Sequence, residues 1–152
     1  MSFKVTGAKE IAAALKRLPR DLQRAAETAV LREGAKPIAK AAKARAPQDS
    51  GLLKKSIGYR VKKVDGVNSA RIGPRTGMKQ QVTRKRPNGT TYTETADPNK
   101  YSHLVELGSS RNPAKPFIRP AVDASKGDVI NAMAKGYEKH LTKTITKLRT
   151  RR

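Results

Sequence analysis

The sequence predicts an α+β protein in which long N-terminal and C-terminal helices pack on a small antiparallel sheet, with a polar β-hairpin insertion. Apolar residues recur at three- and four-residue steps near both ends of the chain, which is the spacing of amphipathic helices. Two central stretches each contain a turn signal, Asp-Gly in the first and Pro-Asn-Gly in the second, as is typical of β-hairpins. Because the chain has 152 residues and no internal repeat, we expect one domain over residues 1–152.

The first third of the chain is predicted to be mainly helical. A short strand is expected over residues 2–6, followed by a helix from residue 8. Pro19 separates this helix from a second one, because proline fits the first turn of a helix and not its interior. The second helix is rich in alanine and is expected from about Asp21 to Ala44, with a kink near residues 33–37.

Residues 48–74 are predicted to form a capped turn, a short helix and a hairpin. Asp49 or Ser50 is expected to accept amide protons as the N-cap of a helix that ends at Ser56. The hairpin is expected to comprise strands over 57–64 and 67–72, joined by Asp65-Gly66 and stopped by Gly73-Pro74.

Residues 75–98 contain almost no large apolar side chains and are predicted to be a hairpin insertion. Its strands are expected over 80–85 and 90–95, around a turn at Pro87-Asn88-Gly89. A polar hairpin buries little apolar area and is only marginally stable by itself. We therefore expect it to be mobile in the free subunit or ordered by a partner.

The last part of the chain is predicted to end in an amphipathic helix with one basic side. Residues 100–107 are expected to form a short helix or a strand, and a helical period begins at Phe117. The apolar side of the final helix comprises Ile130, Met133, Tyr137, Leu141, Ile145 and Leu148, and its basic side comprises Lys135, Lys139, Lys143 and Lys147. The basic helix end extends over residues 139–152.

Composition limits the possible functions. The chain has 34 basic and 12 acidic residues, so its net charge is +22, and a polyanion or an acidic partner would relieve the self-repulsion. Residues 101–134 are nearly neutral, with four basic and three acidic side chains. The absence of cysteine excludes disulfides, a thiol nucleophile and cysteine-ligated zinc. No signal peptide or membrane span is recognisable, and we expect a protein made in the cytoplasm.

The sequence gives little support for catalysis. His103 and Glu106 lie three residues apart, but two residues do not make a metal site. No phosphate-binding glycine loop or nucleophile motif is present, and we expect no enzyme activity, metal or cofactor. Two basic clusters are candidate contacts with DNA or with an acidic partner. They are Arg84, Lys85 and Arg86 in the hairpin and Lys135, Lys139, Lys143 and Lys147 in the last helix, and any DNA contact would be to the backbone.

Three segments carry a resemblance to a known family. They are Ala46 to Leu52 with Ser56-Ile57, Tyr101 to Ser109, and Pro113 to Ala121. In this order they resemble the tail-completion (neck) family of long-tailed double-stranded-DNA bacteriophages, over about residues 8–125. The motif residues are Pro47, Asp49, Ser50, Gly51, Leu52, Tyr101, Glu106, Gly108, Pro116, Phe117, Arg119 and Pro120. Ser50 and Ser109 replace threonines of the family pattern, and Leu107 replaces an aromatic residue.

The resemblance implies a structural virion protein at the head-proximal end of the tail. It would complete or cap the tail tube and join it to the DNA-filled head, as a homo-oligomeric ring around the DNA channel, with a hexamer as the default. Its neighbours would be head-completion, tail-terminator or tail-tube proteins, and channel DNA through backbone contacts. The motifs themselves are expected to be architectural, with Glu106 placed to pair with Arg119 and the two prolines holding Phe117 against the core. The alternative is a non-catalytic, sequence-independent DNA-binding protein.

Overall fold

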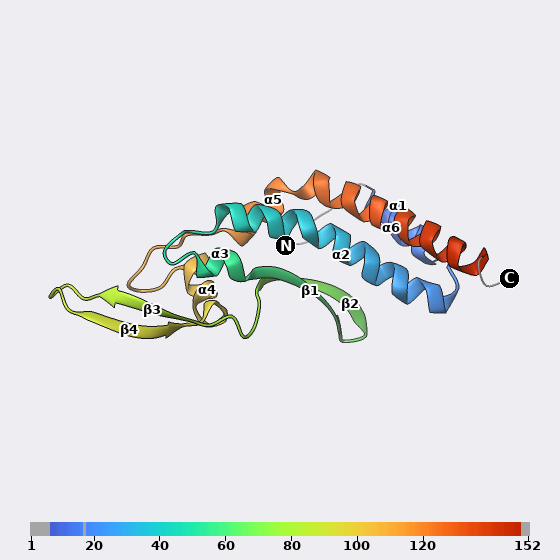
Figure 1. The fold of residues 1–152 in the computed structure, drawn as a ribbon. Helices are drawn as coiled ribbons and strands as arrows, with labels where there is room; N and C mark the ends of the chain where they lie inside the picture. The colour runs from blue at the N-terminus through green and yellow to red at the C-terminus, as the bar shows by residue number, and fades with distance from the viewer. Residues whose placement is uncertain (1–6, 17, 150–152) are drawn as a thin grey trace.

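Helix α2 (Arg20–Arg45) lies at the centre of the molecule, between helix α6 (Lys126–Arg149) and the hairpin of strands β1 (Ile57–Val64) and β2 (Val67–Pro74). The computed structural model describes residues 7–16 and 18–149. Helices α2 and α6 run antiparallel along one another, and both strands contact α2 from its other side (Figure 1). Helix α1 (Ala8–Lys16) packs against α2 and α6. This arrangement confirms the predicted α+β class.

The remaining elements gather near the C-terminal end of α2 or project from it. Helices α3 (Leu52–Ser56) and α5 (Ile118–Ala124) contact α2, and α4 (Pro98–Leu107) contacts α3 and β2. Strands β3 (Gln80–Lys85) and β4 (Thr91–Ala96) form a second hairpin that projects away from the layered part (Figure 1). The described residues therefore contain two separate two-stranded sheets, where the sequence suggested one sheet with an insertion.

Most predicted helix boundaries are confirmed. Pro19 precedes α2 as its N-cap, and Ala46 ends it, its amide donating to the Ala42 carbonyl. Gly34 and Pro37 lie inside α2. The helix is not interrupted at residues 33–37, where the sequence predicted a kink. Residues 100–107 belong to helix α4, and the alternative of a strand is wrong. The strand expected over residues 2–6 lies outside the described residues.

Two glycines explain how closely α2 and α6 pack. A Cβ atom added to Gly34 would lie 2.6 Å from Cγ of Met133, and one added to Gly136 would lie 2.8 Å from Cγ of Glu33. Glycine in a helix interior costs about 1 kcal/mol relative to alanine. At both positions a methyl group would overlap a side chain of the facing helix, which offsets that cost.

The core is built from small side chains around one aromatic ring. Among the described residues, seven of the twelve buried hydrophobic ones are alanines, and most of these alanines belong to α2. At the C-terminal end of α2, Phe117 is fully buried in a cluster with Leu53 and Ile57, and with Ala42 and Ala121. Phe117 is therefore the core anchor that the sequence predicted.

The Asp-Gly turn determines the register of the first hairpin. Asp65 and Gly66 have φ values of 49° and 82°, which is the left-handed conformation that a two-residue hairpin turn requires. Counting outward from this turn pairs Val64 with Val67 and Ile57 with Pro74. The expectation that Gly73-Pro74 stops the pairing is wrong. Pro74 occupies the last position of its strand, where the missing N–H is tolerated.

The close packing of α2 and α6 predicts opposite effects of two similar substitutions in α6. G136A should destabilise the protein by about 1–3 kcal/mol, because the new methyl group would overlap Cβ and Cγ of Glu33. G127A should stabilise it by about 0.5–1 kcal/mol, because nothing lies within 4 Å of a Cβ there. Urea unfolding measures both changes, and equal stabilisation by the two alanines would contradict the packing.

Candidate functional site

The three sequence motifs meet at one end of the molecule, around a groove of about 620 Å³. The first motif contributes the loop from Pro47 to Gly51, and the second contributes Tyr101, Leu104 and Val105 from α4. The third contributes Pro113 and Lys115 from the loop that follows α4. The structure therefore brings together segments that lie more than fifty residues apart in the sequence.

The loop of the first motif ends in a left-handed glycine. Gly51 has a φ of 72° and is the N-cap of α3, so the N-cap position predicted for Asp49 or Ser50 is wrong, although Ser50 does accept an amide proton from the first residue of this helix. The Ser50 hydroxyl accepts only a long hydrogen bond, 3.4 Å, from the Leu52 amide. Leu52 is buried, and Pro47 precedes the turn on the groove wall. The motif residues thus turn the chain from α2 into α3.

Asp49 instead holds the second hairpin. Its Oδ2 accepts a hydrogen bond of 2.9 Å from Nη1 of Arg84, whose Nε donates to Glu94 on the neighbouring strand. The hydrogen bond with Glu94, opposed by desolvation and reinforced by Asp49, raises the pKa of Arg84 above its ordinary value. Arg84 therefore anchors the hairpin to the motif loop, although the sequence suggested a free partner contact.

Glu106 joins the second motif to the third. Its carboxylate accepts hydrogen bonds from the backbone amides of Phe117, Ile118 and Arg119, at 2.7, 2.9 and 3.0 Å. These are orphan amides of the first turn of α5, so the side chain caps that helix from a distance. The prediction that Glu106 forms an ion pair with Arg119 is wrong. Among the described residues, its hydrogen bonds go to the main chain, and the exposed Arg119 side chain acts only through its charge.

The pKa of Glu106 reflects two opposing effects. Desolvation by burial would raise the pKa of this carboxyl, but the hydrogen bonds from Ile118, Phe117 and Arg119 and the charge of Arg119 outweigh it. The pKa of Glu106 therefore lies below its ordinary value. A carboxyl that is held ionised in this way stabilises the folded state above its unfolded pKa and loses that contribution as the pH falls.

Gly108 and Ser109 shape the loop between α4 and α5. Gly108 has a φ of 82°, and a Cβ there would lie 2.9 Å from the backbone nitrogen of Ala114. The Ser109 hydroxyl accepts from the Asn112 amide at 3.2 Å, which closes a tight turn. The Lys115 amide then donates to the Val105 carbonyl at 2.8 Å. These contacts return the chain to α4 and place Phe117 over the core.

The prolines and the tyrosine of the motifs also have structural places. Pro120 lies in the first turn of α5, where proline is tolerated, and Pro116 precedes Phe117 on the exposed loop. Tyr101 packs its ring against the core cluster and borders the groove, and burial raises the pKa of its phenol. Apart from Pro116 and Arg119, which are exposed, the motif residues lie in turns, caps, core contacts or the groove wall.

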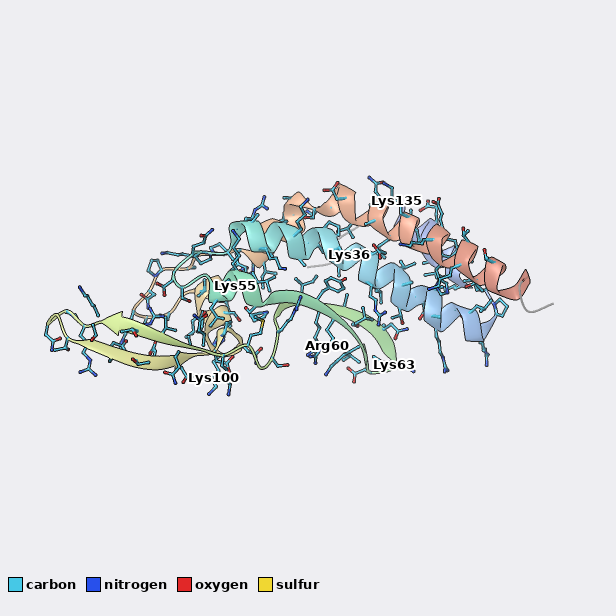
Figure 2. All side chains as sticks on the ribbon, in the orientation of Figure 1. Lys36, Lys55, Arg60, Lys63, Lys100 and Lys135 are labelled. Carbon is cyan, nitrogen blue, oxygen red and sulfur yellow. The ribbon has the colours of Figure 1, made fainter. Side chains whose placement is uncertain are left out.

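The basic residues predicted as partner contacts lie on separate surfaces. Lys85 and Arg86 are exposed in the second hairpin, where the Arg86 guanidinium lies 5.1 Å from the centre of the Tyr92 ring. Lys135, Lys139 and Lys143 are exposed on α6, and the Lys147 side chain lies outside the described part of the chain. Figure 2 shows Lys135 on the side of the molecule opposite to Arg60 of β1. The structure does not combine these residues into one site.

The groove offers no arrangement of groups for catalysis or metal binding. No group of three His, Cys, Asp or Glu side chains that could hold a metal occurs among the described residues. His103 is exposed on α4 and does not reach the groove wall. No helix in the described part of the chain is long and apolar enough to cross a membrane. Most of the motif residues therefore hold the protein's own chain together.

Comparison with known families agrees with this conclusion. A family model described as "Bacteriophage HK97-gp10, putative tail-component" matches residues 9–108, which is about two thirds of the chain. The chain belongs to this HK97-gp10-like family of structural, non-catalytic phage tail components. The match includes the first motif and all but the last residue of the second, and it ends before the Pro113–Ala121 segment. No curated protein and no solved structure matched the chain.

Two features of this region were missed at the level of sequence. The Arg84–Asp49 contact joins residues 35 positions apart, and no local pattern signals it. The cap made by Glu106 could have been predicted. Its carboxylate lies at the end of α4, shortly before the start of α5, where no nearby side chain accepts the free amides. Phe117 cannot provide a side-chain cap, so α5 takes its acceptor from elsewhere.

The Glu106 cap predicts a specific pH dependence. E106Q should lower the free energy of unfolding by about 1–2 kcal/mol at pH 7, because a neutral amide is a weaker acceptor for the three main-chain donors. The difference from wild type should shrink as the pH falls below the ordinary pKa of a glutamate, about 4.3, and through the lower pKa that Glu106 has in the folded state.

D123N is the matched control, since Asp123 is an exposed carboxylate of α5 whose ion pair, among the described residues, is with Lys126 at 3.0 Å. Its effect should stay within about 0.5 kcal/mol. Urea unfolding between pH 3 and pH 8 measures both variants, and an E106Q effect that equals that of D123N would refute the cap.

Proposed function

We propose that the protein completes the phage tail at its head-proximal end and joins it to the DNA-filled head, as a ring of identical subunits around the DNA channel. Membership of a tail-component family supports a place in the tail. The observation that carries the ring is a nearly neutral, partly apolar surface around α4 in a chain of net charge +22. A sixfold ring would match the sixfold symmetry of tail tubes.

The α4 surface has the properties of a subunit contact. Leu104 and Leu107 are 46% and 60% exposed, although the described core contains few large apolar side chains. Leu104 borders the groove, and Leu107 borders a second hollow beside Pro116 and Pro120. Bringing highly charged subunits together requires low local charge at the contact. Residues 101–134 are the only long stretch of this sequence that provides it.

The second hairpin and α6 are the proposed contacts with other neck components. The hairpin projects as an arm from the layered part and carries Lys85 and Arg86 near its tip (Figure 1). Arg84, the next-to-last residue of β3, ties this arm to Asp49 close to its turn, and the mobility expected of the hairpin stays a prediction. The exposed lysines of α6 repeat every four residues, and their mutual repulsion favours an acidic neighbour or DNA opposite them.

A sequence-independent DNA-binding protein is the second candidate. Two observations favour DNA binding. The net charge is +22, and among the described residues most exposed cations form no ion pair with an acidic side chain. The two candidates differ in the absence of DNA. A ring component forms a discrete oligomer by itself, whereas a protein that only coats DNA stays monomeric.

The ring proposal predicts that an exposed leucine matters for assembly and not for folding. L107S should weaken subunit association about 10–100-fold, because the buried area of one leucine is lost from the interface. The melting temperature of the monomer should be nearly unchanged, since this side chain is 60% exposed within the subunit.

V67S is the matched control, because Val67 is 65% exposed at the far end of the first hairpin. Sedimentation velocity or light scattering over a concentration series measures the oligomer. A monomeric wild type, or equal loss of the oligomer in both variants, would reject α4 as the subunit contact.

A further inference from the structure

The outer face of the β1–β2 hairpin is not covered by α2. The inner face is marked by Ile57, which is buried in the core, and by Asn68, whose Nδ2 donates to Oε2 of Glu27 in α2 at 2.7 Å. Side chains alternate between the two faces along a strand. The outer face therefore carries every second residue of each strand, beginning with Gly58 in β1 and Val67 in β2. Figure 2 shows Arg60 of β1 directed away from the helices.

This outer face carries a row of cations. Arg60 and Arg71 are directly paired across the two strands, and Lys62 follows on the same face. The Arg75 side chain lies over Gly58, at the end of the row away from the turn. A Cβ atom added to Gly58 would lie 2.5 Å from Nε of Arg75. We call Arg60, Lys62, Arg71 and Arg75 the outer sheet cluster. All four are exposed, and none forms an ion pair with a described residue.

The cluster is unfavourable for the isolated subunit. Like charges directly opposite one another on a sheet destabilise the pairing. A threonine or a glutamate in place of either arginine of the central pair would remove that repulsion. The arrangement is therefore explained by an anion outside the subunit, which the cations bind together.

We propose that the outer sheet cluster binds the phosphate backbone of duplex DNA without reading its sequence. Three of the four cations are arginines, whose planar guanidinium binds phosphate through two parallel hydrogen bonds. The other residues of this face are Gly58, Gly73, Ser69, Val64 and Val67, so no aromatic side chain is available for stacking on the bases of a single strand.

The same composition argues against an acidic protein as the occupant. The cores of protein interfaces are depleted of charge and enriched in aromatic residues, and this row has the opposite character. The cluster is also distinct from the basic residues of α6, because Lys135 lies on the opposite side of the molecule (Figure 2). The inference does not rest on the ring, since DNA binding can be measured whether or not the subunits assemble.

The test is the salt dependence of duplex binding. Fluorescence anisotropy of a labelled 25-base-pair duplex of arbitrary sequence, titrated with the full-length protein at several salt concentrations, gives the slope of log affinity against log salt. The triple variant R60Q/K62Q/R71Q should reduce the magnitude of this slope by about 2–3 units, because each lost phosphate contact contributes about 0.9.

The matched control is R24Q/R32Q/K40Q, which removes two arginines and one lysine that are exposed on α2. Its slope should change by less than about one unit. R60K/R71K should keep most of the slope, because it retains the charge, and circular dichroism reports whether each variant is folded. R60Q alone should not lower the melting temperature, because it relieves the repulsion from Arg71.

Three results would overturn the proposal. One is a salt slope that stays unchanged in the folded triple variant, or a slope that falls as much in R60K/R71K as in the triple variant. Another is an equal reduction by the α2 control, which would show a general effect of net charge. The third is displacement of the duplex by poly-glutamate of equal total charge at equal concentration, which would indicate an acidic protein as the occupant.

Discussion

The close contact between α2 and α6 is the constraint on which the rest of the structure depends. It requires glycine on both helices, at Gly34 and Gly136, and it lets small alanines form most of the core. Because α2 also contacts α1, α3, α5 and the first hairpin, its position determines theirs. A chain with few aromatic residues and a large positive charge is thereby held together mainly by small side chains packed around one helix.

The motifs of the family extend this framework to one end of α2. Gly51 turns the chain into α3, Phe117 fills the space beside Leu53 and Ile57, and Glu106 binds the start of α5 to the end of α4. Their role is to hold a nearly neutral surface in a fixed shape, which leaves the charged surfaces free for other partners. The function proposed for the protein follows from this separation, with self-assembly at α4 and anion binding on the first hairpin.

Much of the fold could be predicted from the sequence because its signals are local. Pro19 and Ala46-Pro47 mark the limits of α2, and the Asp65-Gly66 turn determines the first hairpin. The turn also determines the cross-strand pairs, so the opposition of Arg60 and Arg71 could have been found by counting outward from it. The contacts of Arg84 and Glu106 could not be found in this way. They depend on how α3, α4 and the second hairpin are placed in space, and a charge pattern does not distinguish an internal anchor from a partner contact.

Electron cryo-microscopy of the assembled oligomer, with duplex DNA present, tests the central claim most directly. The account predicts a closed ring in which the α4 surface lies between neighbouring subunits and the outer sheet cluster lines the central channel. A ring in which Arg60 and Arg71 face the outside, or in which Leu104 and Leu107 remain exposed to solvent, would contradict it.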